Sequence, residues 1–486
     1  MQLCKKGIIP CTLVLLYIFI IIHQSSAQVT RTVAPTFTWA RWWTTCIDLW
    51  YLYFQNAGDS SYLPAIDDYV KDPASTNSTD FLRYISMARM GCHSSVSDDL
   101  FRDFVLPRKI GREFYHSWRD SVLKDFHHIR LPVDRKDYPA VLNTVHEFVR
   151  KRVKFSSISR SGHTLGYNEI LELGQGDCTV LATIGTFILR GLGVPATIDF
   201  TYSWANFDGQ MHSWVTILEP GGKFTPFMPG DGIPFGYDPF IFIKDKIDGK
   251  HDTYKLCAKV FRRRSLPNSL YCREPLFSQP ATSMLQDGRF EDVSDLYGPV
   301  SDIRIPLNNV ADYIGVYNNH KWNPVWIAHK PSGTKVKVFT KMRRGLLYCL
   351  MRKDSEGYQP VGAPFVLTGD DHIRKLSPRK TYDEIKVAAL CSNLNYQLKE
   401  FSKVSGKTFR TRMHAIAIGR LTRRPEKGNI YRISYWDGKW KDAGESTADS
   451  QLIFEDVPSG SIYRLFDIKT NEFSRPFTID SIFQYW

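Results

Sequence analysis

The sequence predicts an α+β protein in three parts: a helical N-terminal region, an α+β core and two β-sandwich-like modules at the C-terminal end. Three observations support this prediction. In the first part of the chain, apolar residues recur three and four positions apart, as in amphipathic helices. The middle combines one helical segment with short β-branched and aromatic strands separated by tight turns, which is typical of α+β folds. The remaining part repeats a strand–turn–strand pattern, which favours two related β-modules.

The chain of 486 residues is too long for one hydrophobic core, so it should contain several domains. Hydrophobic residues make up 43% and charged residues 23%, as in ordinary globular proteins. The changes of pattern predict a helical region at 28–155, a core at 156–275, and modules at 295–375 and 405–486. The polar stretch 376–403 is predicted to be a connection between the modules.

The first 27 residues have the pattern of a signal peptide. Lys5 and Lys6 precede the apolar run 7–22, and small residues at 25–27 offer a cleavage site. An uncleaved anchor is the alternative interpretation of the same run. No later stretch approaches the roughly 18 apolar residues that a membrane span needs. We therefore expect an exported protein, periplasmic or extracellular, without an integral membrane segment after cleavage.

The chain is moderately basic, with a formal net charge of +13 that falls to +11 when Lys5 and Lys6 are removed. The charge is scattered, and its densest run is Arg262, Arg263 and Arg264. This run is predicted to be a solvated loop; attraction to an anionic cell-surface glycan is the alternative. Nucleic acid is not an expected partner, because the chain is predicted to be exported and has no recognised nucleic-acid module.

Nine cysteines become seven after cleavage, and an odd number leaves at least one unpaired thiol in an oxidising compartment. Cys178 is the candidate for the unpaired thiol. Up to three disulfides remain for the others, and the sequence does not determine their connectivity. Cys257 and Cys272 lie close enough in sequence to close a short loop. The other cysteines of the mature chain are Cys46, Cys92, Cys349 and Cys391.

Helical spacing in the N-terminal region predicts four helices, at 46–54, 79–90, 112–126 and 138–153. Prolines fall between them and act as breakers. The stretch 103–119 is predicted to be a packed turn around a buried Trp118. A wall of a substrate groove is the alternative for that stretch.

A predicted helix begins at Cys178 and forms the centre of the core. Asp177 can act as its N-cap, and the apolar residues that follow recur at helical spacing until Gly191, Gly193 and Pro195 end the helix. A thiol in the first turn faces unpaired backbone N–H groups and the positive end of the helix dipole. Both would favour the thiolate.

Three strands are predicted after this helix, at 196–202, 211–218 and 223–228. The loop between the first two carries Trp204, and the second strand carries His212 and Trp214. A cysteine nucleophile and a histidine base brought to it by a following strand are the components of thiol acyl transfer. We therefore predict that Cys178 and His212 form a catalytic pair.

The two β-modules share a pattern in which a tyrosine precedes a tryptophan by nine residues, at 313–322 and 431–440. A strand, a polar turn and a second strand that begins at tryptophan predict a β-hairpin in each module. The tryptophans are predicted to pack in the modules, and stacking on carbohydrate is the alternative. These residues are Trp322, Trp326, Trp436 and Trp440.

Several motifs of the core resemble those of the transglutaminase-like superfamily. They are the helix that opens at Cys178 and ends in Leu-Arg-Gly-Leu-Gly-Val-Pro, and the sequence His212-Ser-Trp214 before a Gly-Gly turn. The chain is most similar to exported members from Bacteroidetes, in which Ile-Asp-Phe-Thr, a tryptophan loop, His-Ser-Trp and Pro-Phe follow in that order. Here these are 198–201, Trp204, 212–214 and 226–227.

The resemblance implies a papain-like fold with a Cys-His-Asp triad that acts on amide bonds. It assigns Cys178 as nucleophile and His212 as base, but Met228 stands where the family has the aspartate. Asp231, three residues later, is the first substitute and Asp199 the second. Further predictions concern the substrate: Trp204, Trp214 and Gln175 as binding residues, and the Cys178 N–H with Gln175 or Trp204 as oxyanion donors.

These residues predict an exported cysteine-dependent amide-bond hydrolase or acyl transferase that forms a thioester at Cys178. A peptide, protein or glycopeptide is the expected substrate. No cofactor is expected, and no metal, because no set of ligands has the required spacing. The alternative is a catalytically inactive domain that binds peptide or glycan, which Met228 favours. A thiol-labelling experiment distinguishes the two hypotheses.

Overall fold

The computed structural model describes fifteen segments of the chain. These are residues 87–111, 118–156, 165–206, 209, 211–219, 222–230, 237–243, 253–264, 289–387, 390–391, 409–411, 422–423, 425–449, 452–479 and 484–485. The chain divides into two units, Met1–Leu63 and Pro64–Trp486. All described residues belong to the second unit, so the predicted signal peptide and the helix 46–54 lie outside the description.

The described helices precede the core sheet in sequence. They are α5 (Asp98–Phe104), α6 (Trp118–Asp125), α7 (Tyr138–Arg152), α8 (Tyr167–Leu173) and α9 (Cys178–Gly191). The predicted helices at 138–153 and at Cys178 are confirmed, α6 is the described part of 112–126, and 87–90 are helical at the end of 79–90. The two seven-residue helices α5 and α8 are not predicted, because two turns show little periodicity.

Trp118 begins α6 and lies in the core, as the sequence predicts. Its side chain is 3% exposed, its ring centroid lies 4.9 Å from that of Phe187 in α9, and its Nε1 donates to the Arg108 carbonyl at 2.7 Å. Trp118 is therefore a packed core residue that lines no groove, and residues 112–117 of the predicted turn lie outside the described residues.

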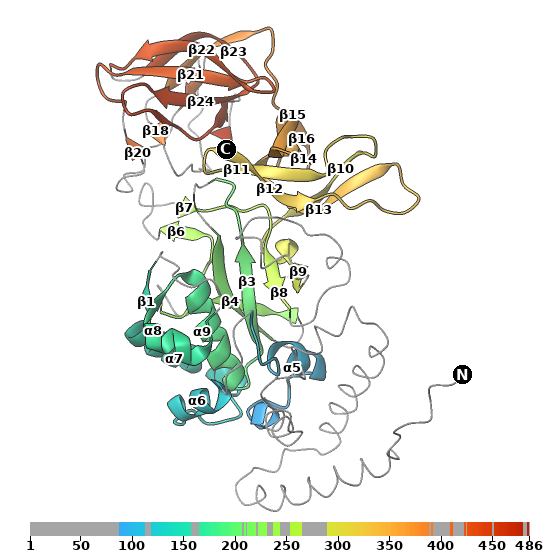
Figure 1. Cartoon of the computed structure of the whole chain (residues 1–486), viewed down its shortest axis with the longest axis vertical. Coiled ribbons are helices and arrows are strands. Elements are labelled where there is room, and N and C mark those ends of the chain that lie inside the picture. The colour runs from blue at the N-terminus through green and yellow to red at the C-terminus, as the bar shows by residue number, and fades with distance from the viewer. Residues whose placement is uncertain are drawn as a thin grey trace, which may run out of the picture. The chain divides into compact units, whose positions relative to one another are not determined.

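The core sheet is antiparallel, and its strands follow the order β5 (Phe224–Phe227), β4 (His212–Leu218), β3 (Ala196–Thr201), β8 (Phe261–Arg263) and β9 (Phe290–Asp292). The predicted strands are thus confirmed. Figure 1 shows α9 packed beside β4 and β3. The sheet includes β9, which lies beyond residue 275. Short pairs complete the core: β1 (Lys154–Phe155) with β2 (Gln175–Gly176), and β6 (Ile241–Ile243) with β7 (Thr253–Tyr254).

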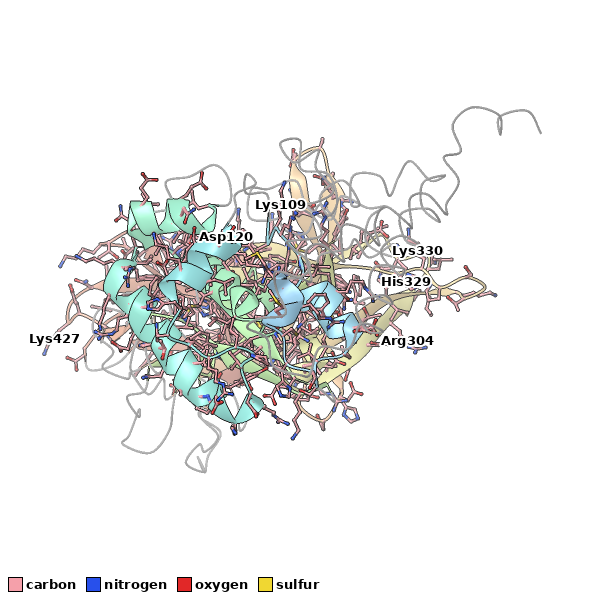
Figure 2. The ribbon with its side chains drawn as sticks, turned by 90° about the horizontal axis from the view of Figure 1, so that it is seen from below. Lys109, Asp120, Arg304, His329, Lys330 and Lys427 are labelled. Atoms are coloured by element: carbon pink, nitrogen blue, oxygen red, sulfur yellow. The ribbon has the colours of Figure 1, made fainter. Side chains whose placement is uncertain are left out.

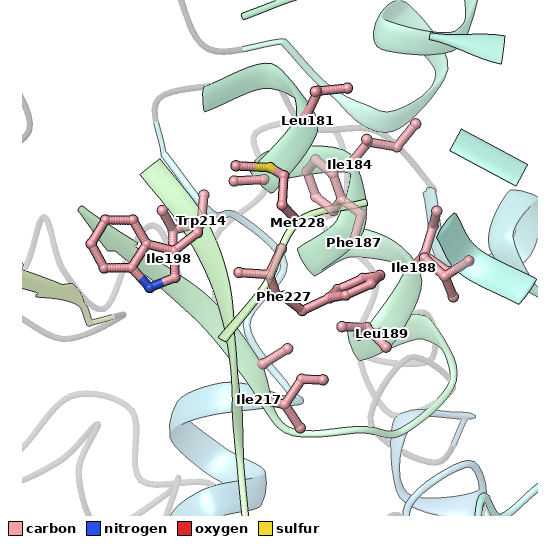
Figure 3. Packing of buried hydrophobic residues seen from close by; sticks show 14 of the residues in the cluster. Leu181, Ile184, Phe187, Ile188, Leu189, Ile198, Trp214, Ile217, Phe227 and Met228 are labelled. Atoms are coloured by element: carbon pink, nitrogen blue, oxygen red, sulfur yellow. The ribbon is translucent and has the colours of Figure 1, made fainter. Parts of the chain in front are cut away.

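Helix α9 is buried almost all round, because the sheet and the other helices both cover it. Leu181, Ile184 and Phe187 are at most 1% exposed and lie in one cluster with the sheet residues Phe227 and Met228 (Figure 3). Burying one such side chain stabilises the fold by about 1.5–3 kcal/mol. The approach of helix and strand is close at Gly185, where a Cβ would lie 2.7 Å from the Pro229 ring.

The prediction of a solvated loop at the triple-arginine run is wrong. Arg262 and Arg263 lie in β8 and are 7% and 5% exposed, and Arg264 forms salt bridges with Asp103 and Glu291. These guanidinium groups are occupied by partners inside the protein, so the run offers no basic patch to a glycan. The sequence shows the charges of the run, but not the carboxylates and carbonyls that bind them from distant segments.

The first module contains two sheets. One pairs β10 (Val300–Pro306) with β13 (Val336–Arg343), and the other has the order β12, β11, β14, β15, β16. The strands of the second sheet are β11 (Tyr313–Asn318), β12 (Lys321–Ile327), β14 (Leu346–Asp354), β15 (Gly357–Leu367) and β16 (Ile373–Lys375). The predicted hairpin is β11 with β12, joined by a turn at Asn319 and His320.

The second module repeats this topology. Its larger sheet runs β22 (Trp440–Thr447), β21 (Ile430–Trp436), β24 (Ile462–Asp467), β26 (Phe477–Ile479), β27 (Gln484–Tyr485), with β25 (Glu472–Phe473) on β24. Its smaller sheet joins β17 (Tyr382–Val387) to β23 (Leu452–Pro458) and β19 (Phe409–Thr411); β18 (Leu390–Cys391) pairs with β20 (Thr422–Arg423). Because β17 takes the place that β10 has in the first module, the prediction that 376–403 is only a connection is wrong.

Three of the four module tryptophans pack inside, as predicted, and Trp440 is half-buried. Trp322, Trp326 and Trp436 are 7%, 3% and 6% exposed, so their faces are closed to a carbohydrate ring.

Charged side chains such as Arg304 and Lys330 are exposed and point outward in Figure 2. Within the described part of the chain, no helix combines the length and apolar character needed to cross a bilayer.

Candidate active site

Cys178 is the first residue of α9, where the sequence predicts it. The Asp177 carboxylate caps the helix and accepts from the backbone N–H groups of Thr179 and Val180, at 2.9 and 3.1 Å. The half-buried Cys178 thiol lies 3.9 Å from the Met211 carbonyl oxygen, at the start of β4. The core therefore places the thiol next to the chain segment that carries His212.

The prediction that the helix end favours the thiolate is wrong for this structure. Burial raises the pKa of the Cys178 thiol to about 11, and the Asp177 carboxylate contributes in the same direction. The same side chain that caps the helix thus places a negative charge beside the sulfur. At neutral pH the thiol is protonated.

His212 is the first residue of β4, and its side chain lies on the face of the strand away from α9. The next residue, Ser213, faces the helix, with its Oγ 3.3 Å from the Thr179 hydroxyl. Because neighbouring strand residues point to opposite faces, the imidazole lies on the other side, with ring centroids 5.9 Å from Trp204 and 5.6 Å from Trp214. No hydrogen bond joins the two described side chains of Cys178 and His212.

The imidazole of His212 contacts Tyr237, whose hydroxyl lies 2.7 Å from Nε2. Burial lowers the pKa of His212 to about 3, and the ammonium of Lys255 contributes to this shift. The Lys255 Nζ lies 5.2 Å from the ring centroid of Trp204. At neutral pH the imidazole is therefore uncharged, as is the protonated thiol of Cys178.

None of the described residues supplies the third member of a triad. Met228 is 1% exposed and packs against α9 (Figure 3), and it has no oxygen to orient an imidazole. Asp199 is completely buried in β3, where Arg262 and Tyr297 bind its carboxylate, so it is not directed to His212. The preferred candidate, Asp231, lies outside the described residues, after Gly230 and before Tyr237.

The predicted binding residues divide into two groups. Trp204 and Trp214 are 1% and 0% exposed and pack around His212, and their contact with substrate stays a prediction. The Trp214 indole N–H donates to the Tyr297 hydroxyl at 3.0 Å. Gln175 is half-buried in β2, three residues before Cys178, and stays a candidate oxyanion donor with the Cys178 N–H.

Cys178, Cys257 and Cys349 are free thiols. The suggested disulfide of Cys257 with Cys272 is wrong, because the Cys257 thiol is free, 1% exposed, and lies in the core cluster. Among the residues in the described segments, no group of three or more His, Cys, Asp or Glu side chains is arranged to hold a metal ion.

Sequence reasoning does not find Tyr237 or Lys255. Tyr237 lies in a stretch without periodicity, and Lys255 is one of many scattered cations. Their roles depend on the fold of two loops beside β4, and no local motif signals either residue.

The comparison with known families agrees with this geometry. Residues 133–229, from the start of α7 through β5, match the sequence profile described as the transglutaminase-like superfamily. This segment is a transglutaminase-like domain. The matched segment contains α7, α8, α9, the loop that carries Trp204 and the strand that carries His212, so the resemblance of the motifs is confirmed.

No curated protein matches the chain. A proposed cysteine protease from Cytophaga hutchinsonii is similar at 13% identity and a TM-score of 0.19, over 33% of this chain and 45% of that one. Red sea bream transglutaminase is similar at 12% identity and a TM-score of 0.20, over 67% and 65%. The chain thus covers less than two thirds of either protein. Both TM-scores are below 0.5, so no function is drawn from them.

Proposed function

We propose that the chain is an exported cysteine-dependent amide-bond hydrolase or acyl transferase, with Cys178 as the nucleophile. The observation that carries this proposal is the position of the thiol: it opens α9 and lies 3.9 Å from the carbonyl of the residue before His212. A peptide, protein or glycopeptide is the proposed substrate. The site belongs to a transglutaminase-like domain, and acyl transfer through a thioester is the chemistry that a cysteine at this position performs.

The reaction starts from a neutral pair. The Cys178 sulfur attacks the amide carbonyl, and its proton passes to the uncharged imidazole of His212. For this step the His212 side chain has to leave the Tyr237 hydroxyl and turn toward the helix. The C–N bond then breaks, the imidazolium returns the proton to the leaving nitrogen, and a thioester stays on Cys178. Attack of water, or of an amine, releases the acyl group and restores the thiol.

Backbone N–H groups would stabilise the oxyanion. Asp177 occupies the N–H groups of Thr179 and Val180, so the N–H of Cys178 and the side chain of Gln175 are the proposed donors.

An electrophilic peptide probe, such as a peptidyl acyloxymethyl ketone, tests the proposal at pH 7. We expect Cys178 to be modified, as located by peptide mass spectrometry, and His212→Ala to slow the reaction at least tenfold. Cys349, free and fully buried, serves as the internal control. Labelling no faster than that of a free thiol, or at an equal rate in His212→Ala, contradicts the proposal.

A second function, peptide binding without catalysis, is favoured by Met228 and by the absence of a Cys178–His212 hydrogen bond. The same probe tests it. Binding of an unreactive peptide in a titration, together with no covalent labelling of Cys178, would support this function over the first.

A further inference from the structure

The loop between β3 and β4 encloses one side of the site. We call its residues 203–209 the tryptophan loop; of these, Ser203, Trp204, Ala205, Asn206 and Gly209 are described. On the core side, the Ala205 N–H donates to the Leu256 carbonyl at 2.6 Å, and the Asn206 side chain accepts from the Leu256 N–H at 2.6 Å. Trp204 is thereby placed beside His212.

The other side of the tryptophan loop is bound by the first β-module, through Asn318 at the end of β11. The Asn318 Nδ2 lies within hydrogen-bond distance of the Ser203 hydroxyl at 3.2 Å and of the carbonyls of Trp204 and Gly209, both at 3.1 Å. Its Oδ1 accepts from the Gly209 N–H at 3.1 Å. Asn318 is 2% exposed, so all the polar atoms of its side chain are spent on this loop.

The repeat of the two modules shows that Asn318 is not needed for the hairpin itself. The hairpins align residue by residue, and Trp436 occupies the position of Asn318 in the second module. Trp436 packs on Trp440 and Trp322, with ring centroids 5.3 and 6.4 Å apart. The same backbone position thus holds an aromatic packing residue in one hairpin and a buried amide directed to the core in the other.

The second module contacts the same loop. The Arg475 side chain is 1% exposed, and its Nη2 donates to the Ala205 carbonyl at 3.0 Å and to the Tyr317 carbonyl at 2.7 Å. Tyr317 is the residue before Asn318. Both modules therefore contribute a buried polar side chain to the segment that covers His212.

We propose that Asn318 is a positioning residue for the candidate active site: by binding the tryptophan loop, it keeps the Trp204 indole against the His212 imidazole and excludes water from that ring. The β-modules are then part of the site's architecture. The inference rests on the proposed function only in taking His212 as the base.

Exchange of the imidazole C2 hydrogen, followed by mass spectrometry between pH 2 and 9, tests the inference on the full chain. We compare the wild type with Asn318→Ala and with Asn309→Ala. Asn309 is a matched control, because its side chain accepts a hydrogen bond from the Ala311 N–H inside the same module. The groups that bear on the imidazole, the Tyr237 hydroxyl and the Lys255 ammonium, are unchanged in both variants.

We expect C2 hydrogen exchange at His212 in the wild type to have its pH midpoint near 3, the pKa that burial gives the imidazole. In Asn318→Ala this midpoint should rise by at least one pH unit, toward the ordinary value of about 6.5. Asn309→Ala should keep the wild-type midpoint. An unchanged midpoint in Asn318→Ala, or an equal rise in both variants, overturns the inference.

Amide hydrogen exchange in the wild type keeps the inference testable if Asn318→Ala does not fold. The Gly209 N–H, which donates to Asn318, should be protected at least tenfold against exchange. Exchange at the rate of an unstructured peptide overturns the inference.

Probe labelling of Cys178 separates this inference from the proposed function. If the wild type is not labelled but the His212 midpoint rises in Asn318→Ala, the result contradicts the proposed function and supports the positioning role. Conversely, suppose that the wild type is labelled and that Asn318→Ala has the same labelling rate and the same His212 midpoint. This result contradicts the positioning role alone.

Discussion

Arg262 binds both carboxylate oxygens of Asp199 across the β3–β8 pair, with Nε and Nη2 each 2.9 Å from an oxygen. Asp199 is completely buried, and Tyr297 donates a third hydrogen bond to it at 2.6 Å. This ion pair explains two features of the sequence. It provides the partner of one arginine of the triple-arginine run. It also occupies the carboxylate of Asp199, the predicted candidate for the triad acid that lies among the described residues.

Arg262→Ala should destabilise the protein by about 3–5 kcal/mol, because it leaves the Asp199 charge buried without its cation. Chemical denaturation monitored by tryptophan fluorescence measures the loss. The matched control is Arg432→Ala, which removes two hydrogen bonds to one carboxylate oxygen of Glu445 on the exposed face of the second module. That change should cost less than about 1 kcal/mol. Equal losses would show that burial of the Asp199 pair has no special effect.

The pH dependence of Cys178 alkylation should follow the raised pKa of its thiol. Iodoacetamide reacts with the thiolate, so its rate with Cys178 should rise steadily from pH 7 and level off only near pH 11. A free cysteine in a peptide levels off near its own pKa of about 8.5. Quenched time courses analysed by peptide mass spectrometry give both profiles. A plateau for Cys178 below pH 8 would show that the resting site stabilises the thiolate.

Asp177 is predicted to act on both the helix and the thiol. Asp177→Asn keeps a side chain that can cap α9 but removes the charge, so the pKa of Cys178 should fall and its iodoacetamide profile should move to lower pH. Asp177→Ala should move the profile in the same direction and also cost about 1 kcal/mol of stability, because the cap is lost. Thermal unfolding separates the two variants. An unmoved profile in both would exclude the carboxylate as a cause of the raised pKa.

The sequence predicts those features of the site that are determined by residues near one another in the chain. The start of α9 is predicted, since Asp177 and the apolar spacing that follows are both local signals. The face from which the His212 side chain leaves β4 is not, because one residue of register reverses it and the register depends on the whole sheet. The partners of Arg262 and Asn318 come from segments far away in sequence, so only the fold reveals them.

The fold shows the same division. The hairpin at Tyr313 is predicted from its own repeat pattern, whereas β17 is not, because its partner β23 lies far along the chain. A single strand has no local sign of the sheet it joins. Long-range pairing of this kind is therefore what the sequence-based prediction misses in the modules.

Gly193 should tolerate no side chain. It follows α9 with φ of +76°, and a Cβ there would lie 1.9 Å from the Gly91 carbonyl oxygen. Gly193→Ala should therefore cost about 2–6 kcal/mol, from backbone strain and from overlap with the neighbouring chain. Gly222→Ala is the matched control, because its φ is +80° but no atom lies within 4 Å of the added Cβ. That variant should lose only about 1–2 kcal/mol. Equal losses in denaturation would contradict the close approach of Gly193 to Gly91.

The most direct test of the account is whether Cys178 carries an acyl group during turnover. Intact-mass spectrometry after rapid mixing with a peptidyl p-nitrophenyl ester at pH 7 measures this. The account predicts a covalent adduct with the mass of the acyl group, located on Cys178, absent in Cys178→Ser and at least tenfold slower to form in His212→Ala. An adduct that forms equally fast in His212→Ala, or no adduct on Cys178 while the ester is hydrolysed, would contradict the claim that Cys178 is the nucleophile.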